Sequence, residues 1–391
     1  MKLLKKAWGV VALALAATLV LGLLGGALLP DTVSHFTGES PSVPALCTLT
    51  SDGGGEGEAT VRLLGLLPIK RVTVREYESL SLCPGGGVFG LRAPLGGVLV
   101  TALSGVPGEG SGCRGPAEEA GVLRGDLITA IGGVPLTRAE ALADAVGRCE
   151  GSLMLTLLRQ GQTLTVSITP RVGSDGRRVA GLLVRDCVAG IGTVTYIDPR
   201  TGEFGGLGHG VYDASLGGLV PLSRGTVTEV GLSGVTPGAS GSPGELRGHL
   251  RSERIGTLLS NTECGVFGVL SGIPSADTAI PVGLRDSLKV GPAEILCTVA
   301  DGITARYGIE ITSLRGKRGD DTSFSIRVTD PRLLSQTGGI VQGMSGSPII
   351  QDGKLVGAVT HVLIGDPACG YGIFIENMLN AAENQVRPKA A

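Results

Sequence analysis

Aromatic residues and histidines are scarce in this 391-residue chain. Phe, Trp and Tyr make up 3% of it, and it contains four histidines. Val, Leu, Ile and Gly are plentiful instead, a composition that favours short strands and tight turns over helical bundles. Apolar residues recur in strand-like runs along the sequence, which argues against disorder over most of its length. We therefore expect a mainly β protein with room for two or more domains.

The chain also lacks a strong charge of either sign. Its formal net charge is -2 and it has no long basic run, so nucleic acid is not an expected partner. The eight cysteines are scattered without a CxxC pair, which argues against zinc-ribbon and thioredoxin-type chemistry. No His-Glu-x-x-His motif is present, which excludes a zinc-dependent intramembrane protease. We expect no metal and no cofactor, while disulfides and buried free thiols both stay open.

One long hydrophobic run lies at the N-terminus. After three lysines in the first six residues, apolar or small residues extend from Trp8 to Leu29, with Thr18 as the only polar side chain. As a helix this run would span about 33 Å, enough to cross a bilayer core of about 30 Å. Residues 1–30 are interpreted as a transmembrane signal-anchor, with a cleaved signal peptide as the alternative. The lysines place the N-terminus in the cytoplasm and the rest of the chain outside it.

Composition divides the remainder into four segments. Residues 31–58 are rich in Ser, Gly and Pro and are interpreted as a flexible tether. Two strand-like runs predict a small β element over residues 59–82. Short strands around one helix occupy residues 83–170, and strands at intervals of about ten residues fill residues 171–391. Such regular spacing predicts a sandwich or a barrel.

Residues 83–170 resemble a PDZ domain. The family signature A-x-x-A-G-(apolar)-x-x-G-D-x-I runs here from Ala117 to Ile128. The resemblance implies that a peptide segment, for example from the chain's own N-terminal region, adds as a strand to this domain. It also implies a carboxylate-binding loop formed by Phe89, Gly90 and Leu91.

A serine flanked by small residues lies near the C-terminal end. Ser345 stands in the string G-M-S-G-S-P, which is followed by a strand, an Asp-Gly turn and a second strand. Small neighbours let a substrate backbone approach, and the amides of Gly343 and Ser345 can both point at a developing oxyanion. The string G-A-S-G-S-P around Ser240 repeats the motif without a strand to anchor it. Ser345 is therefore the candidate nucleophile.

A serine nucleophile needs a base, and an imidazole is the usual one. His35 lies in the expected tether, and His249 lies among charged residues. His209 ends a glycine-flanked strand, a position that suits an exposed catalytic group. His361 lies on the strand after the nucleophile loop, where it could line a pocket. The spacing favours His209 as the base and leaves His361 open.

Several strings together resemble the stage IV sporulation protein B peptidases. They are G-L-G-H at 206–209, T-D-P-R-L-L at 329–334 and G-G-I-V-Q-G-M-S-G-S-P-I-I at 338–350. The order of anchor, PDZ domain and peptidase agrees as well. The resemblance implies a chymotrypsin-like β-barrel serine peptidase, whose triad consists of Ser345 as nucleophile, His209 as general base and Asp330 as acid.

The acid is the weakest member of this triad. Asp330 precedes Ser345 by fifteen residues, far closer than in ordinary members of the chymotrypsin-like fold. Asp213, four residues after His209, is the alternative acid. Asp330 would also suit a purely structural role, because Asp-Pro sequences initiate turns.

The resemblance further implies a membrane-tethered endopeptidase in the space between the two forespore membranes of endospore-forming bacteria. Its substrate would be a regulatory protein of an intramembrane protease complex, and cleavage would activate the late mother-cell sigma factor. Self-cleavage within residues 31–58 is also expected. The alternatives are a PDZ scaffold without catalysis and an HtrA-type quality-control protease, a type in which the PDZ domain follows the protease domain.

Overall fold

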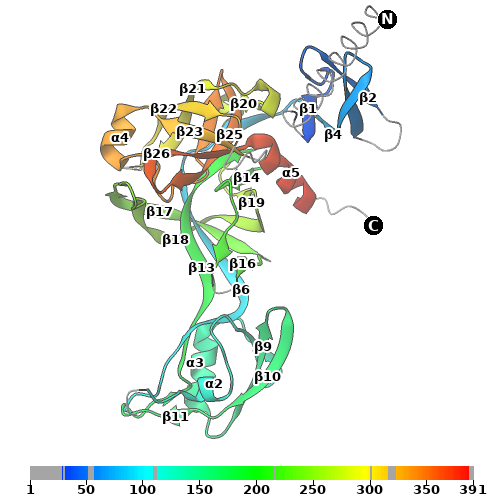
Figure 1. The fold of residues 1–391 in the computed structure, drawn as a ribbon. Helices are drawn as coiled ribbons and strands as arrows, with labels where there is room; N and C mark the ends of the chain where they lie inside the picture. Colours follow the sequence, from blue (N-terminus) through cyan, green and yellow to red (C-terminus); the bar gives the residue numbers. More distant parts are fainter. Residues whose placement is uncertain are drawn as a thin grey trace, which may run out of the picture.

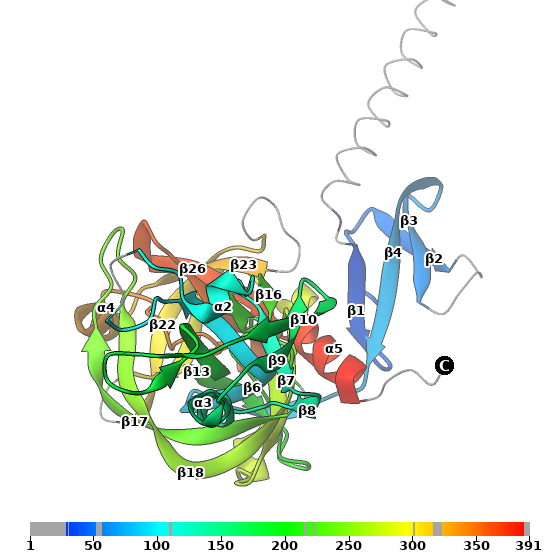
Figure 2. The ribbon, with the colours of Figure 1, turned by 90° about the horizontal axis from the view of Figure 1, so that it is seen from below.

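The computed structural model describes residues 29, 31–51, 57–108, 112–214, 217–222, 224–299, 302–315 and 323–386. These residues form an N-terminal sheet, two β-barrels and a PDZ domain (Figures 1 and 2). Strands far outnumber helices, so the mainly β prediction is confirmed. No helix among these residues is long and apolar enough to cross a membrane. The expected anchor at residues 1–30 lies outside the described residues, apart from Leu29.

The N-terminal sheet has four strands in the order β1-β4-β3-β2, with β1 parallel to β4. Its core contains Leu29, Val33 and Val61. Two of its strands fall in the expected tether, so the prediction of a flexible segment is wrong for that part. The sequence missed them because Ser, Thr and Gly dominate the local composition. The strands are β1 (Thr32–Phe36), β2 (Cys47–Ser51), β3 (Glu58–Leu63) and β4 (Leu67–Tyr77).

The first barrel is a ring of six strands, β6-β17-β18-β19-β14-β13, which closes through a long antiparallel pairing of β6 with β13. Its strands are β6 (Val88–Leu103), β13 (Leu182–Ile197), β14 (Glu203–Gly206), β17 (Gly225–Thr236), β18 (Glu245–Thr262) and β19 (Gly265–Leu270). Short strands at its margins are β5 (Ser81–Pro84), β15 (Tyr212–Asp213), β16 (Gly218–Leu219) and β20 (Ile280–Pro281).

The second barrel is closed in the order β21-β22-β23-β26-β25-β24. Its strands are β21 (Gly291–Thr298), β22 (Thr304–Ser313), β23 (Ser323–Val328), β24 (Pro348–Gln351), β25 (Lys354–Leu363) and β26 (Asp366–Phe374). The associated helices are η1 (Ala276–Thr278), η2 (Arg285–Ser287), α4 (Pro331–Thr337) and α5 (Ile375–Val386). Two six-stranded antiparallel barrels are the architecture of chymotrypsin-like peptidases.

The PDZ domain is inserted into the first barrel. The long strands β6 and β13 run side by side from the barrel into this domain, as Figure 1 shows. Its elements are α2 (Pro116–Glu119), β7 (Leu127–Ile131), β8 (Val134–Pro135), α3 (Ala139–Arg148), β9 (Leu153–Arg159), β10 (Gln162–Ile168), β11 (Arg171–Val172) and β12 (Arg178–Val179). The expected PDZ bounds of 83–170 are therefore wrong at both ends, because β5 and the first half of β6 belong to the barrel, and β11 and β12 extend the PDZ domain beyond residue 170.

The expected carboxylate-binding loop is a buried barrel strand. Phe89 is fully buried, and its ring packs edge-on against Phe204 with the ring centroids 5.7 Å apart. Gly90 pairs with Ile191 on one side and with Thr228 on the other. This corrects the assignment of Phe89, Gly90 and Leu91 to the PDZ loop. An apolar-Gly-apolar string occurs in both settings, and the sequence did not reveal that β6 starts in the barrel.

All eight cysteines are free thiols in this structure. Burial raises the pKa of the Cys297 thiol to about 12, so this residue is unreactive at neutral pH.

Candidate active site

A single residue of the first barrel joins the two loops expected to carry the nucleophile and the base. On β13, the Thr193 backbone N–H donates to the Ser345 carbonyl at 2.9 Å, and the Thr193 carbonyl accepts from the Leu207 N–H at 3.2 Å. Its hydroxyl donates to the Gly343 carbonyl at 2.8 Å. The hydrogen bonds of β13 therefore hold the serine loop of the second barrel against the histidine turn of the first.

Two glycines allow this close approach. A β-carbon at Gly346 would overlap the Thr193 carbonyl oxygen and the Leu207 backbone nitrogen. A β-carbon at Gly208 would press on Thr360 and Ile373 of the second barrel, at 3.1 Å and 3.2 Å. Because Gly346 follows Ser345 and Gly208 precedes His209, these contacts bring the serine loop close to the histidine turn. The roles of Ser345 as nucleophile and His209 as base stay predictions.

The turn before His209 is strained in a way typical of functional sites. Leu207 adopts a left-handed φ of 67°, which few non-glycine residues do, and its side chain is buried. Its side chain packs in the core of the first barrel with Phe89 and Phe204. The buried Leu207 therefore fixes the direction in which the chain delivers His209 to the cleft.

The protonation state of His209 follows from its hydrogen bond. Its Nδ1 atom lies 2.9 Å from the Gly210 carbonyl oxygen. Because a carbonyl only accepts, Nδ1 must carry the proton, and Nε2 is left as the basic nitrogen. Burial lowers the pKa of His209 below its usual value, and the bond to Gly210 offsets part of that shift. A pKa below the usual value keeps His209 mainly neutral at pH 7, and Nε2 has no hydrogen-bond partner among the described residues, as a general base requires.

The Ser345 hydroxyl donates to the Thr360 carbonyl on β25 at 2.7 Å. The next residue, His361, places its ring against that of His209, with the centroids 4.7 Å apart and the planes at 33°. Burial and the neighbouring His209 both lower the pKa of His361. His361 thus lines the site beside the base, which is the pocket-wall role left open by the sequence.

The backbone N–H groups of Gly343 and Ser345 are the predicted oxyanion hole. Gln342 donates its N–H to the Gly244 carbonyl and accepts from the Leu246 N–H, both at 2.8 Å. The C=O and N–H of a trans peptide point in opposite directions, so the Gly343 N–H points away from Leu246. Neither the Gly343 nor the Ser345 N–H donates to another described residue. This arrangement fits the predicted oxyanion hole, whose function stays a prediction.

A cleft of about 640 Å³ opens beside the histidine turn and the second half of β25. The residues that line it include Gly208, His209, Glu263, Thr360, His361 and Tyr371. Glu263 is the one carboxylate among the described lining residues, and it lies in the exposed turn between β18 and β19. No group of three or more His, Cys, Asp or Glu side chains in the described part of the chain is arranged to hold a metal ion.

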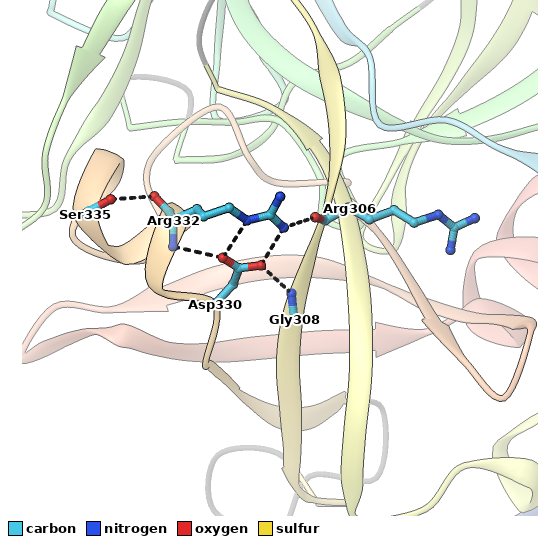
Figure 3. Close-up of polar contacts among 5 residues, drawn as sticks. All are labelled: Arg306, Gly308, Asp330, Arg332 and Ser335. Carbon is cyan, nitrogen blue, oxygen red and sulfur yellow. Dashed lines mark hydrogen bonds and ion pairs between the residues drawn. The ribbon is translucent and has the colours of Figure 1, made fainter.

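Asp330 acts as the cap of a helix. Its side chain accepts from the backbone N–H of Arg332 at 2.9 Å and from the Gly308 N–H at 3.3 Å, and it caps α4 (Figure 3). The Arg332 guanidinium also donates to it at 3.1 Å and 2.8 Å and holds the pKa of this carboxyl well below its usual value.

None of the contacts that Asp330 makes among the described residues is with His209. Gly308 lies on β22, on the opposite side of the barrel from β25, which carries Thr360 and His361; two strands separate them in either direction. The role of Asp330 as triad acid therefore stays a prediction without structural support. Asp213, the alternative acid, is buried and forms an ion pair with Arg185.

Two positioning groups were missed by the sequence. The Gly210 carbonyl takes the place that a triad acid would hold at Nδ1, but a backbone group leaves no signal in a sequence. Thr193 lies in an ordinary β-strand pattern, so only the fold shows its contact with the serine loop. Ser240, the repeated motif, instead donates to the Gly365 carbonyl at 2.9 Å.

Comparison with known proteins identifies two family profiles that match this chain. A profile of the SpoIVB peptidase S55 family matches residues 176–379, and a PDZ-domain profile matches residues 112–160. Serine protease HTRA1 of Xenopus tropicalis is 38% identical over 56 residues, which cover 14% of this chain and 12% of that protein. This chain thus spans a small part of that relative's length.

Solved structures of two proteases are distantly similar. The HtrA-type protease AlgW with a decapeptide is 11% identical, with a TM-score of 0.32, and the match covers 52% of this chain and 54% of that one. The active form of the Rv3671c protease from M. tuberculosis is 16% identical, with a TM-score of 0.30 and coverage of 51% and 74%.

The peptidase profile matches more than half of the chain and includes His209 and the whole serine loop. The chain therefore belongs to the SpoIVB peptidase S55 family and is a serine peptidase.

Proposed function

We propose that the protein is a membrane-tethered serine endopeptidase of endospore-forming bacteria. It acts outside the cytoplasm, between the forespore membranes, and cleaves a regulatory protein of an intramembrane protease complex, which activates the late mother-cell sigma factor. One observation carries the catalytic part: Thr193 holds the Ser345 loop against the turn that presents His209. Family membership supports the sporulation role, and the hydrophobic run from Trp8 to Leu29 supports the tether.

The chemistry follows from the protonation state of His209. The Ser345 hydroxyl turns from the Thr360 carbonyl to His209 Nε2, which takes its proton as Oγ bonds to the scissile carbonyl carbon. The negative charge that forms on the carbonyl oxygen is bound by the Gly343 and Ser345 amides. His209 then returns the proton to the leaving amine as the C–N bond breaks. Water then attacks the acyl-Ser345 ester, with His209 again taking and returning the proton, which releases the carboxylic acid product and restores Ser345.

Substrate would bind as an added strand on β25. The pairing of β25 with β24 ends at Ala358, so residues 360–363 have a free edge toward the cleft among the described strands. An extended peptide can pair with such an edge through its backbone. The Thr360 carbonyl becomes available when the Ser345 hydroxyl leaves it, which couples substrate binding to activation of the nucleophile.

The PDZ domain offers a second edge for a peptide. Leu182–Arg185 of β13 pair with β6 on one side only, and Leu183 is exposed. The helix α3 lies beside this segment, where the Asp186 side chain accepts from the Ala139 N–H at 2.9 Å. A peptide strand between β13 and α3 would replace the position first expected at Phe89.

The first test of this function is proteolysis in trans. Full-length wild-type protein and the Ser345→Ala variant are each incubated with membranes that carry the intramembrane protease complex, and new N-termini are sequenced. We expect cleavage of the regulatory subunit by the wild type alone. The Ser345→Ala protein incubated with wild type also reports self-cleavage, expected in the Thr37–Leu46 loop between β1 and β2. Cleavage by Ser345→Ala would refute the mechanism, and an intact regulatory subunit would refute the proposed substrate.

An HtrA-type quality-control role is the second candidate. In the expected HtrA arrangement the PDZ domain follows the protease, whereas here it lies between two strands of the first barrel. Broad digestion of unfolded proteins, with no preference for the regulatory subunit, would favour that role.

A further inference from the structure

The chain enters the N-terminal sheet at the end where β4 begins. The Lys70 ammonium donates to the Leu29 carbonyl at 2.6 Å, and Asp31 accepts from the Thr73 backbone N–H at 2.9 Å. Asp31 therefore lies beside Thr73 of β4, whereas Leu29, two residues earlier, is bonded by Lys70, three residues earlier in β4. That direction leads toward Leu67, where β4 begins. The hydrophobic run that precedes Leu29 therefore meets the sheet at the end where β4 starts.

Four exposed leucines gather at this same end. Leu46, Leu64, Leu66 and Leu67 form what we call the leucine tip, with exposed fractions of 64%, 67%, 82% and 38%. The hairpin between β3 and β4 carries three of them, and the Leu64 N–H donates to the Leu46 carbonyl at 2.7 Å. Isolated exposed leucines are ordinary, but a cluster of this kind marks an interaction site.

The turn itself is an unusual place for leucine. Leu64 and Gly65 have φ angles of 51° and 75°, and the Leu66 N–H donates to the Leu63 carbonyl at 3.0 Å. Positive φ at both central residues defines a type I′ turn, which favours Asn or Asp followed by Gly. Leucine here is strained and exposed at once, so folding alone does not explain its presence.

Cations stand directly behind the leucine tip. Arg62 donates to the Leu66 carbonyl at 3.4 Å and to the Thr50 hydroxyl at 3.0 Å. With Lys70 and Arg71 it lines a polar hollow next to the tip. Lys70 is paired with Asp31 at 2.8 Å, the acidic group on the same side. This arrangement fits a bilayer surface, because the leucines can enter the acyl-chain boundary while the basic side chains contact the lipid phosphates.

We propose that the leucine tip inserts into the interfacial region of the bilayer that receives the N-terminal hydrophobic run. This proposal rests on the membrane tether of the proposed function. From Lys70 to Leu67 is about 10 Å along an extended strand, comparable with the depth of about 5–10 Å to which interfacial elements enter a membrane. The chain that ends at Leu29 and the tip thus reach the same surface.

This second contact would orient the catalytic cleft. The Tyr77 hydroxyl at the end of β4 donates to Asn380 Oδ1 on α5 at 2.7 Å. Phe36 and Tyr77 also pack on the hydrophobic cluster that contains Ile375 and Met378 of α5. The N-terminal sheet is therefore fastened to the second barrel. With a single anchor the enzyme can rotate relative to the membrane plane. An anchor together with the inserted leucine tip fixes the orientation of the catalytic cleft relative to the bilayer.

Depth-dependent fluorescence tests the proposal on the full-length chain. Trp8 is the only tryptophan, so Trp8→Phe gives a background without indole. Leu66→Trp then reports on the tip, and Val134→Trp is the matched control, because Val134 is 69% exposed on β8 of the PDZ domain. Both variants, carrying Ser345→Ala against self-cleavage, are reconstituted in vesicles of phosphatidylcholine and phosphatidylglycerol with brominated acyl chains.

We expect both proteins to float with the vesicles. The Leu66→Trp emission should be blue-shifted and quenched at least twofold by bromine, and the Val134→Trp emission should be unchanged. Flotation with no more quenching at residue 66 than at residue 134 would overturn the tip insertion and leave the tether standing. Failure to float would contradict the tether and the tip together. Adding Leu64→Asn to the Leu66→Trp variant should relieve the backbone strain at the turn and make the protein more stable in detergent. It should also reduce the quenching at residue 66, because the tip loses an apolar side chain.

Discussion

Replacing Asp330 separates its structural role from a catalytic one. Asp330→Asn keeps an oxygen that can cap α4, since Asn and Asp are equally good N-caps. It removes the ion pair with the largely exposed Arg332, worth about 0–1 kcal/mol. Asp330→Ala also removes the cap, about 1 kcal/mol, and leaves the Gly308 N–H without its side-chain acceptor, about 1 kcal/mol more. Because an Asn amide has only one oxygen, Asp330→Asn also leaves the Gly308 N–H without an acceptor when that oxygen caps α4. We expect losses of stability of about 1–2 kcal/mol for Asp330→Asn and about 2–3 kcal/mol for Asp330→Ala.

The activity of the same variant tests whether Asp330 also has a catalytic role. His209 is oriented by the Gly210 carbonyl, so Asp330→Asn should keep kcat within a few-fold of wild type. An asparagine in place of a true triad acid lowers kcat by about 10⁴. Urea denaturation in the Ser345→Ala background measures stability, and hydrolysis of a fluorogenic peptide measures kcat. A loss of activity near 10⁴ with unchanged stability would refute the reasoning and restore Asp330 to the triad.

The low pKa of Asp330 gives this variant a pH signature. A carboxyl whose folded pKa is depressed stabilises the protein above its unfolded pKa and loses that contribution as the pH falls through the folded value. The stability difference between wild type and Asp330→Asn should therefore persist from pH 7 down to about pH 4 and shrink only below that. A difference that disappears between pH 7 and pH 5 would contradict the contacts of Asp330.

Two further predictions concern the base and the serine loop. Because burial lowers the pKa of His209, the pH at which kcat/KM falls to half its maximum on the acid side should lie below the usual histidine value of about 6.5; a half-maximal point above that value would contradict the burial. Thr193→Val removes the hydroxyl bonded to the Gly343 carbonyl and should lower kcat by about tenfold or more, while Thr193→Ser retains most activity. Equal rates for the two variants would exclude this positioning role.

The serine loop and its approach to the histidine turn could be predicted because their local strings are specific. Ser345 needs a tight loop followed by an anchoring hairpin, and the Asp352-Gly353 turn that forms it adopts the expected positive φ angles of 50° and 75°. The glycines around His209 likewise reflect a close contact between barrels. These constraints are local in sequence, so they could be recognised there.

What the sequence did not reveal depends on contacts between distant segments. The sequence pattern at the start of β6 predicts a part of the PDZ domain. In the structure this segment pairs with β13, about one hundred residues later, and closes the first barrel. Strands β1 and β2 lie in polar sequence and are held by pairing with β3 and β4. An Asp-Pro string serves as a helix cap or as a triad acid, and only the neighbours of Asp330 distinguish the two.

Covalent labelling with a fluorophosphonate tests the central claim most directly. Peptide mapping of the labelled full-length protein should place the adduct on Ser345. The Ser240→Ala variant, which changes the same local string outside the site, should label as fast as wild type. Ser345→Ala should not label, and His209→Ala should label at least a hundredfold more slowly. An adduct on another residue, or equal labelling of the His209→Ala variant, would contradict Ser345 as the nucleophile activated by His209.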